Sequence, residues 1–379
     1  MSDPGTRAVV LTAPGRAAVA VVRVWGAGAV ELVSETVRLR GQASGAMKVP
    51  RLGRMRDGRG DEVVVIGDPG GEWVELQCHG GRAAVASVLE ELAGRGVEVV
   101  DRATWYRLDA PNRLVAEARA DLERAETDRA AEILIDQAEG ALAEAVAGWI
   151  ERLGRDEVGA ETVRAEIREA VGRGRIGRRL IAGWRIVLAG RPNVGKSTLF
   201  NALVGFERSL VDPEPGTTRD LVTRRGAFGG WPVVLIDSAG LRASQDPIES
   251  EGIDRSRVAM ARADLVLELH DGSVPREAGD GATPRRAGQV LQVATKRDLA
   301  ACWSPEDAGM VWVSARTGEG LGQLVDRIAA RLVPDPPQPG DPVPTRGRQI
   351  RGLRAAIRWL GRGEIGQAVA ALRSLLDGS

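Results

Sequence analysis

Cysteine and histidine are almost missing from this sequence of 379 residues. Cys78 and Cys302 are the only cysteines, and His79 and His270 are the only histidines. So few thiols and imidazoles exclude a cysteine-histidine metal cluster and a disulfide framework. The adjacent pair Cys78-His79 is therefore interpreted as structural.

The sequence also lacks an excess of either charge. Lys and Arg together number 52, as do Asp and Glu, so no overall basic field attracts nucleic acid or an anionic membrane. Any RNA contact must be local. No apolar run reaches the roughly 18 residues that a membrane-spanning helix needs, and arginines interrupt the first apolar stretch. We therefore expect a cytoplasmic protein with no membrane partner.

Lysine is scarce as well, because the basic residues other than Lys48, Lys196 and Lys296 are arginine. Such a composition is expected to keep lysine where a compact ammonium group on a flexible stem cannot be replaced by a planar guanidinium. Lys196 and Lys296 are interpreted in this way, since both lie in motifs described below.

Residues 1–105 have the pattern of a small α+β domain. Val-rich and Ala-rich residues 7–24 predict two short strands joined by a turn, and residues 62–68 and 72–78 predict a second pair. A helix is predicted to follow over residues 82–94.

Residues 106–182 are predicted to form the first part of a helical domain. Between residues 114 and 172 the sequence is dominated by Ala, Glu, Arg and Leu, with apolar residues at three- and four-residue steps. This pattern predicts two or three amphipathic helices.

Residues 183–333 alternate short β-rich runs with helical ones. The β-rich runs are RIVLA, WPVVLID, ADLVLEL, QVLQVA and MVWVSA. This alternation predicts a parallel sheet covered by helices.

Proline occupies six of the eleven positions from Pro334 to Pro344, so residues 334–345 are predicted to be an extended linker. Residues 346–379 then predict two helices, the second and shortened part of the helical domain. Because helical segments flank the α/β unit on both sides, we expect the α/β domain to be inserted in a helical domain.

Residues 190–197, GRPNVGKS, fit the pattern of a phosphate-binding loop, with a predicted strand before them and a predicted helix after them. The glycines let backbone amides approach phosphates. Lys196 would place its charge on the terminal phosphates, and the Ser197 hydroxyl would bind magnesium. The other candidate nucleotide contacts of the loop are Asn193, Val194, Gly195 and Thr198.

Four further elements follow in the order expected of a GTPase. They are Thr217-Thr218 with a switch threonine for magnesium, Asp237 to Gly240 as D-x-x-G, Thr295-Lys296-Arg297-Asp298 resembling N-K-x-D, and Ser314-Ala315-Arg316 resembling S-A-K. A carboxylate such as Asp298 can accept the N1-H and the 2-amino protons of guanine, whereas adenine offers no such pair. GTP is the predicted substrate, and Thr295 in place of asparagine weakens one contact without removing this discrimination.

The catalytic groups are less obvious from the residues. Leu241 follows D-x-x-G, where a glutamine commonly orients water, and it can neither orient water nor neutralise charge. Asn193 could offer its carbonyl oxygen to a monovalent cation that takes the place of an arginine finger, or could only shape the loop. Glu249 could orient the water through a second water, or could only favour a helix N-terminus.

The chain resembles the MnmE (TrmE) family of tRNA modification GTPases. The segments that carry the resemblance are TAPGRAAVAVVRVWG, VELQCHGG, AEARADLERAETDRAAE, GRPNVGKSTLFNAL, VDPEPGTTRD, IDSAGLRASQDPIESEGIDRS, ADLVL and VSARTGEGL. They are spread over residues 12–321, which is most of the chain. The resemblance implies a P-loop GTPase domain inserted in a helical domain, with an N-terminal α+β domain that dimerises and binds folate.

The resemblance also implies functional residues and partners. It implies a potassium-stimulated GTPase homodimer that uses Mg2+ and K+ and acts with an MnmG-like flavoprotein on the wobble uridine of tRNA. It places K+ contacts on Asn193, Asp212, Glu214 and Thr217, Mg2+ contacts on Ser197 and Thr218, and the catalytic role on Glu249. It places contacts to a 5-formyltetrahydrofolate-type folate on Arg23, Glu75 and Arg113.

The sequence departs from the family in three segments. It ends LLDGS without the Cys-x-Gly-Lys signature and the helices before it, lacks the P-N-S-F-T-G-E loop, and has RLDAPNRL where the family has R-A-F-L-N-G-K-L-D-L. Two functions therefore stay open: an enzyme of tRNA wobble uridine modification, and a GTP-driven switch that no longer modifies tRNA and binds a ribosomal or other RNA-protein partner. The arginine-rich segments RGRIGRRLIAGWR and TRGRQIRGLRAAIR could carry phosphate contacts for either function, or could be solvated helix faces.

Overall fold

The computed structural model describes residues 5–13, 17–40, 49–56, 61–155, 159–206, 222–237, 258, 260–275, 289–304 and 309–377. The chain divides into two compact units, Met1–Glu123 and Arg124–Ser379. None of the described helices combines the length and the apolar character that a membrane span needs.

The first unit is built on one sheet, whose described strands run in the order β3-β4-β5-β6-β2-β1-β7. The strands are β1 (Arg7–Val10), β2 (Val19–Trp25), β3 (Val37–Leu39), β4 (Arg51–Met55), β5 (Glu62–Gly67), β6 (Trp73–His79) and β7 (Glu98–Val99). Neighbouring strands are antiparallel except β1 and β7, which are parallel. The predicted strand pairs at residues 7–24 and 62–78 are confirmed, whereas β3, β4 and β7 were not predicted.

Four helices accompany this sheet in the described residues of the first unit: α1 (Ala29–Thr36), α2 (Arg82–Gly94), α3 (Arg102–Asp109) and α4 (Arg113–Leu122). The helix predicted over residues 82–94 is α2. Alternate residues of the central strands, such as Val22 and Leu76, are buried together with Val33 of α1 and Leu92 of α2. The two-residue period of the strands thus turns one face of the sheet into a hydrophobic core.

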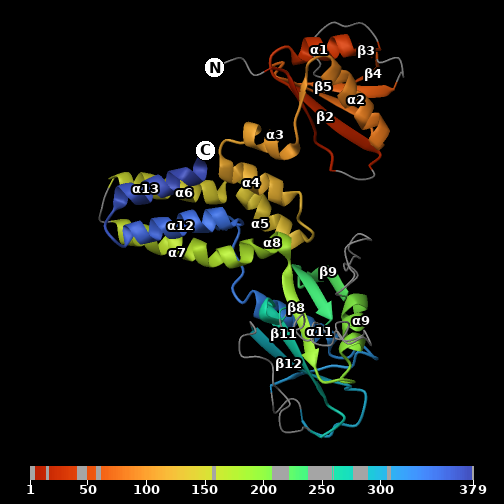
Figure 1. Cartoon of the computed structure of the whole chain (residues 1–379), viewed down its shortest axis with the longest axis vertical. Helices are drawn as coiled ribbons and strands as arrows, with labels where there is room; N and C mark the ends of the chain where they lie inside the picture. The colour runs from red at the N-terminus through yellow and green to blue at the C-terminus, as the bar shows by residue number, and fades with distance from the viewer. Residues whose placement is uncertain are drawn as a thin grey trace, which may run out of the picture. The chain divides into compact units, whose positions relative to one another are not determined.

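The second unit contains the helices α5 (Asp128–Glu139), α6 (Ala141–Arg155), α7 (Ala160–Gly177), α8 (Arg179–Ala182), α12 (Gly347–Leu360) and α13 (Ile365–Leu376). As Figure 1 shows, α12 and α13 lie beside α7 and α6, although some 170 residues of sequence separate the two pairs. The prediction of two or three helices between residues 114 and 172 is wrong, because α4 to α7 are four helices there. Thr127 caps the start of α5, and Gly140, at φ 123°, ends α5 and separates it from α6.

Residues 334–345 contain neither helix nor strand, as predicted, but they are fixed to the helices. Gln137 of α5 donates to the Asp341 carbonyl at 3.0 Å and accepts from the Val343 amide at 3.0 Å. On α7, a Cβ at Gly177 would lie 2.3 Å from the Pro344 carbonyl oxygen, so only glycine lets the linker approach this closely.

The α/β part of the second unit has a sheet with the described strands in the order β13-β12-β11-β8-β10-β9. The described strands are β8 (Trp184–Gly190), β9 (Val222–Phe228), β10 (Trp231–Asp237), β11 (Leu265–Asp271), β12 (Gln289–Thr295) and β13 (Val311–Trp312). Two helices with described bounds accompany them, α9 (Lys196–Phe206) and α11 (Leu321–Leu332). The five predicted β-rich runs are strands β8, β10, β11, β12 and β13. The sheet is not wholly parallel, because Gly229 and Gly230, at φ 57° and 81°, form a two-residue turn that makes β9 antiparallel to β10.

Candidate nucleotide-binding site

The carboxyl ends of the parallel strands β8, β11, β12 and β10 meet at one edge of this sheet. This edge is where α/β proteins of this type bind ligands. Gly190 ends β8, Asp271 ends β11, Thr295 ends β12 and Asp237 ends β10. These residues therefore lie at the same edge of the sheet although they are distant in sequence, and Asp271 was not among the predicted site residues.

The loop after β8 has a backbone that few residue types adopt. Gly190 has φ 147°, and a Cβ there would lie 2.8 Å from the Leu269 carbonyl oxygen of β11. Asn193, at φ 62°, and Gly195, at φ 96°, turn the chain before α9 begins at Lys196. Asparagine is one of the few side-chain-bearing residues that tolerates this left-handed region, so Asn193 shapes the loop whatever else it does.

Lys196 curls back over this loop. Its Nζ donates to the carbonyl of Gly190 at 3.0 Å and to that of Arg191 at 2.7 Å, and the residue is buried. The ammonium group is therefore held at the concave side of the loop, where a phosphate group could accept its protons.

Ser197 and Asp237 form the second contact of the site. The Ser197 hydroxyl donates to Asp237 Oδ2 at 2.8 Å, which joins the first turn of α9 to the end of β10. A hydroxyl and a carboxylate are oxygen donors of the kind that Mg2+ takes. The pair thus fits the predicted magnesium site.

Thr295 joins the phosphate loop to two neighbouring strands. Its Oγ1 lies 2.7 Å from the carbonyl oxygen of Val194 and 3.1 Å from that of His270, and the hydroxyl hydrogen is shared between them. Thr295 is buried, so water does not compete for this hydrogen bond. The residue that replaces asparagine in the N-K-x-D pattern therefore ties the loop to β11 and β12.

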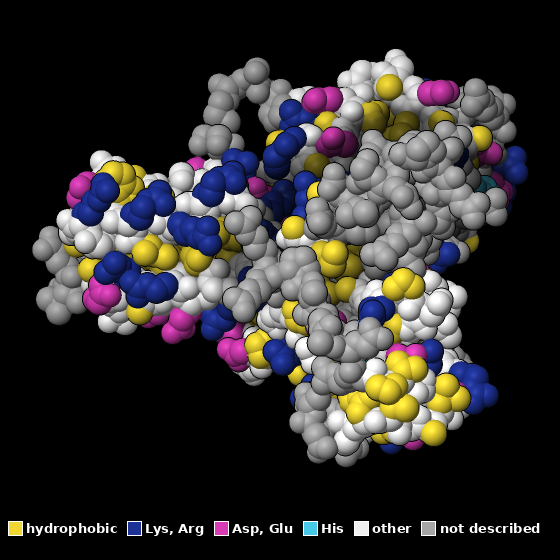
Figure 2. Space-filling model, turned by 60° about the horizontal axis from the view of Figure 1, so that its bottom comes forward, with side chains coloured by type: hydrophobic (Ala, Val, Ile, Leu, Met, Phe, Trp, Pro, Cys, Tyr) yellow, Lys and Arg dark blue, Asp and Glu magenta, His cyan; other side chains and the backbone are white. Residues whose placement is uncertain are grey.

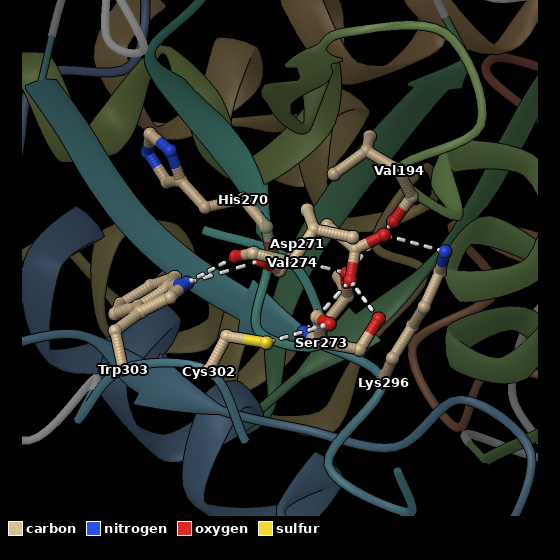
Figure 3. Close-up of polar contacts among 9 residues, drawn as sticks. Val194, His270, Asp271, Ser273, Val274, Lys296, Cys302 and Trp303 are labelled. Carbon is tan, nitrogen blue, oxygen red and sulfur yellow. Dashed lines mark hydrogen bonds and ion pairs between the residues drawn. The ribbon is translucent and has the colours of Figure 1, made fainter. Parts of the chain in front are cut away.

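Lys296 and Asp271 make an ion pair next to this tie, as Figure 3 shows. Lys296 has φ 62°, and its Nζ lies 2.5 Å from Asp271 Oδ2. Asp271 Oδ1 also accepts from the amide and the hydroxyl of Ser273 at 2.9 and 2.6 Å. Burial alone would raise the pKa of Asp271, but these hydrogen bonds and the Lys296 charge lower it overall.

Asp298 is held by the loop that follows β13. The Ser314 hydroxyl donates to Oδ1 at 2.6 Å, and Arg316 Nε donates to Oδ2 at 2.9 Å. The Ser314 hydrogen bond, with help from Arg316, keeps the pKa of Asp298 below its usual range. Asp298 is therefore an ionised acceptor near neutral pH, as recognition of guanine requires.

A cavity of about 560 Å3 opens beside the loop. Its lining residues include Asn193, Val194, Asp271, Lys296 and Trp303. The Trp303 indole donates to the carbonyl oxygens of Asp271 and Val274 at 3.2 and 3.0 Å, which fixes the ring at the wall (Figure 3). Trp303 was not predicted, and its only sequence signal is an aromatic residue shortly after the TKRD motif.

Comparison with known proteins agrees with this geometry. Residues 185–299 match the family model of the 50S ribosome-binding GTPases, and residues 6–105 match that of the GTP-binding protein TrmE N-terminus. The tRNA modification GTPase MnmE of Methylobacterium sp. strain 4-46 is 40% identical over 92% of this chain and 86% of its own length. The chain belongs to the MnmE family. Its fold class is as predicted, and it is a GTP hydrolase.

Two other MnmE proteins show the range of this family resemblance. That of Acidiphilium cryptum is 36% identical over 91% of this chain and 86% of its own length. That of Thermus thermophilus is 33% identical over 92% of this chain and 86% of its own length. The similarity thus extends over the N-terminal, helical and GTPase segments.

Two predicted site residues of this MnmE-family chain lie next to residues already described, and several others are not described by the structure. Thr198 is exposed on α9, and Ala315 is half-buried between Ser314 and Arg316. The predicted residues that lie outside the described ones are Asp212, Glu214, Thr217, Thr218, Gly240 and Glu249.

The predicted folate residues Arg23 and Glu75 face each other across strands β2 and β6. Arg23 Nη2 lies 2.6 Å from Glu75 Oε1, and its guanidinium lies 4.6 Å from the ring centre of Trp73 and 5.5 Å from that of Trp105. The two tryptophans were not predicted. Arg113, at the start of α4, pairs with Glu117 of the same helix at 3.2 Å.

Proposed function

We propose that this protein is a potassium-stimulated GTPase that takes part in the modification of tRNA wobble uridine. The observation that carries the enzymatic part is the convergence of Lys196, Ser197 and Asp237 at the start of α9. The role in tRNA modification is proposed because the chain belongs to the MnmE family, and the MnmE proteins similar to it are tRNA modification GTPases.

In this proposal Lys196 and the loop amides bind the phosphates of GTP. Lys196 would exchange the carbonyls of Gly190 and Arg191 for phosphate oxygens, which are stronger acceptors because they are charged. Ser197 and Thr218 would bind Mg2+, with Asp237 holding the Ser197 side of the site. The bound ion neutralises charge on the phosphates.

Asp298 would select guanine. Both of its oxygens are already oriented by Ser314 and Arg316, so the carboxylate is fixed before a base arrives. Such preorganisation reduces the entropy that binding costs. Lys296 and Ala315 would complete the base site, with Thr295 holding the loop rather than the base.

Hydrolysis needs a positive charge near the transferring phosphoryl group and an oriented water. Asn193 lines the cavity beside the phosphate loop, and we assign its side-chain oxygen to K+ together with Asp212, Glu214 and Thr217. Glu249 would orient the water, because Leu241 carries no polar group.

The tRNA reaction would also use the N-terminal unit. Arg23 is partly exposed, lies close to two indole rings and is paired with Glu75, so it combines a positive charge with flat apolar surfaces. This combination fits a 5-formyltetrahydrofolate-type folate, which has carboxylates and a flat ring and which supplies a one-carbon unit. We further propose a homodimer and an MnmG-like flavoprotein partner, as the family suggests.

Mass spectrometry of tRNA wobble nucleosides tests this function, in the source cell with the gene, without it, and with Ser197→Ala in its place. We expect the modified uridine to disappear without the gene and to return with the wild type but not with the variant. Unchanged nucleosides, in a cell with no second family member, would reject the tRNA part and favour a GTP-driven switch.

A further inference from the structure

The two arginine-rich segments of the sequence differ in their surroundings. In residues 173–185, Arg173 pairs with Asp341 at 3.1 Å and Arg179 pairs with Asp264 at 2.7 Å. Arg175 lies over the ring of Trp184, 5.5 Å from its centre. These guanidinium groups bind other parts of the chain, so this segment stabilises the fold.

The arginines of α12 have a different environment. Arg351, Arg354 and Arg358 are exposed, and their spacing of three and four residues places them on one side of the helix. The opposite side is buried and includes Leu353, which packs in the helical core. We name Arg351, Arg354 and Arg358 the α12 arginine face. Within the described ranges, none of these three guanidinium groups makes an ion pair or a hydrogen bond.

Charge balance is also broken locally. Residues 346–363 contain six arginines and no acidic residue, although the whole chain has equal numbers of basic and acidic residues. Figure 2 shows Lys and Arg side chains predominating on the visible face of the helical segments, at the left of the view. Like charges one helical turn apart destabilise a helix, so the α12 arginine face is not explained by the stability of α12 itself.

The helix that carries this face is firmly held. A Cβ at Gly174 of α7 would lie 2.9 Å from the Ile350 side chain, and a Cβ at Gly352 would lie 2.5 Å from the Leu375 side chain of α13. These close contacts fix α12 between its two neighbours. Arg351 and Arg358 are seven helical steps apart, a rise of about 10 Å, so the face presents a fixed row of charges.

We propose that the α12 arginine face is an RNA-binding surface that holds the phosphate backbone of tRNA. Guanidinium groups bind phosphates through paired hydrogen bonds, and phosphate contacts position a nucleic acid without reading its sequence. This inference rests on the proposed tRNA function and adds the place of contact. It also accounts for local arginine excess in a chain without net charge.

Binding of a labelled, unmodified tRNA transcript to the full-length protein tests the surface. The test variant is Arg351→Gln/Arg354→Gln/Arg358→Gln, since glutamine keeps helix propensity and removes charge. The control variant is Arg152→Gln/Arg155→Gln/Arg168→Gln, which removes equal charge from exposed arginines of α6 and α7 that pair with Glu166, Glu151 and Glu161. Thermal unfolding and RNA-free GTP hydrolysis are measured for both variants and should equal those of the wild type.

We expect the test variant to bind tRNA at least about tenfold more weakly, whereas the control variant binds nearly as the wild type does. Each lost phosphate contact reduces the slope of log K against log salt by about 0.7 to 0.9, so three contacts should reduce it by about 2 to 3. Equal tRNA binding by the test variant and the wild type, or an equal loss of binding in the control variant, would reject the α12 arginine face as the RNA-binding surface. The proposed function would not be affected by that result. If the test variant loses tRNA binding as expected but the wobble nucleosides are unchanged without the gene, the proposed function is rejected and the RNA-binding surface is retained.

Discussion

Thr295→Val tests the idea that the hydroxyl of Thr295 holds the phosphate loop in its binding shape. Valine has nearly the shape of threonine but cannot donate a hydrogen bond. The substitution would leave the carbonyl oxygens of Val194 and His270 without the donor that lies 2.7 and 3.1 Å away. Because the site is buried, water cannot easily replace this donor.

The expected size follows from the energy of a hydrogen bond. A neutral hydrogen bond contributes about 0.5–1.5 kcal/mol, and a buried acceptor left without a partner costs about 1–3 kcal/mol. If about 1–2 kcal/mol of this appears in nucleotide binding, the dissociation constant of GDP rises about 5- to 30-fold. Titration with a fluorescent GDP analogue measures this constant, and thermal unfolding of the same samples measures stability.

Two further variants make the test specific. Thr295→Ser keeps the hydroxyl and should bind GDP within about threefold of the wild type, a difference of less than 1 kcal/mol. Thr295→Asn restores the residue that is usual in N-K-x-D and should bind at least as tightly as the wild type. Wild-type affinity in Thr295→Val would refute the role of this hydroxyl.

Four other substitutions test separate parts of the site. Ser197→Ala removes the hydroxyl that contacts Asp237, so half-maximal turnover should need at least about tenfold more Mg2+, a difference of about 1.4 kcal/mol, in a Mg2+ titration. Asp298→Asn places an amide donor against the guanine donors, and unpaired buried polar groups are strongly rejected. GTP binding should therefore weaken at least about hundredfold, while binding of xanthosine triphosphate should improve. Equal GTP affinity in the variant and the wild type would contradict the role of Asp298 in guanine recognition. The low pKa of Asp298 also predicts that its guanine contact persists as pH falls and is lost only when the pH passes below that pKa. Ser314→Ala should raise the pKa of Asp298, so binding titrations of this variant should show the loss at higher pH. Glu249→Ala should leave nucleotide affinity nearly unchanged and slow single-turnover hydrolysis at least about tenfold, about 1.4 kcal/mol of barrier, and normal turnover would remove Glu249 from the mechanism.

The phosphate loop and most strands could be predicted from the sequence because their signals are local. Residues 190–197 carry a fixed motif, and the helix at residues 82–94 has a continuous pattern that matches α2. Strand β9 is absent from the sequence prediction, although Gly229-Gly230 directly before β10 is a local turn signal.

Contacts between distant segments could not be predicted in this way. Thr295 meets Val194 across 101 residues, and this meeting depends on the packing of β12 beside β11 and β8. The indole of Trp303 enters the cavity wall only because the loop after β12 returns toward β11. Neither contact produces a periodic pattern of residues in the sequence.

The two arginine-rich segments show the same limit. In the sequence they look alike, since both combine arginine with glycine and apolar residues. The structure separates them, because Arg173 and Arg179 meet carboxylates from distant segments while the α12 arginine face does not. Which charge is paired is decided by tertiary packing and not by local composition.

The most direct test of the central claim is the rate of GTP hydrolysis in K+ and in Na+ at equal ionic strength, for the wild type and for Asn193→Ala. A K+ site at Asn193 predicts faster hydrolysis in K+ for the wild type and equal, slow rates in both salts for the variant. Equal rates in K+ and Na+ for the wild type would contradict the claim that this protein is a potassium-stimulated GTPase.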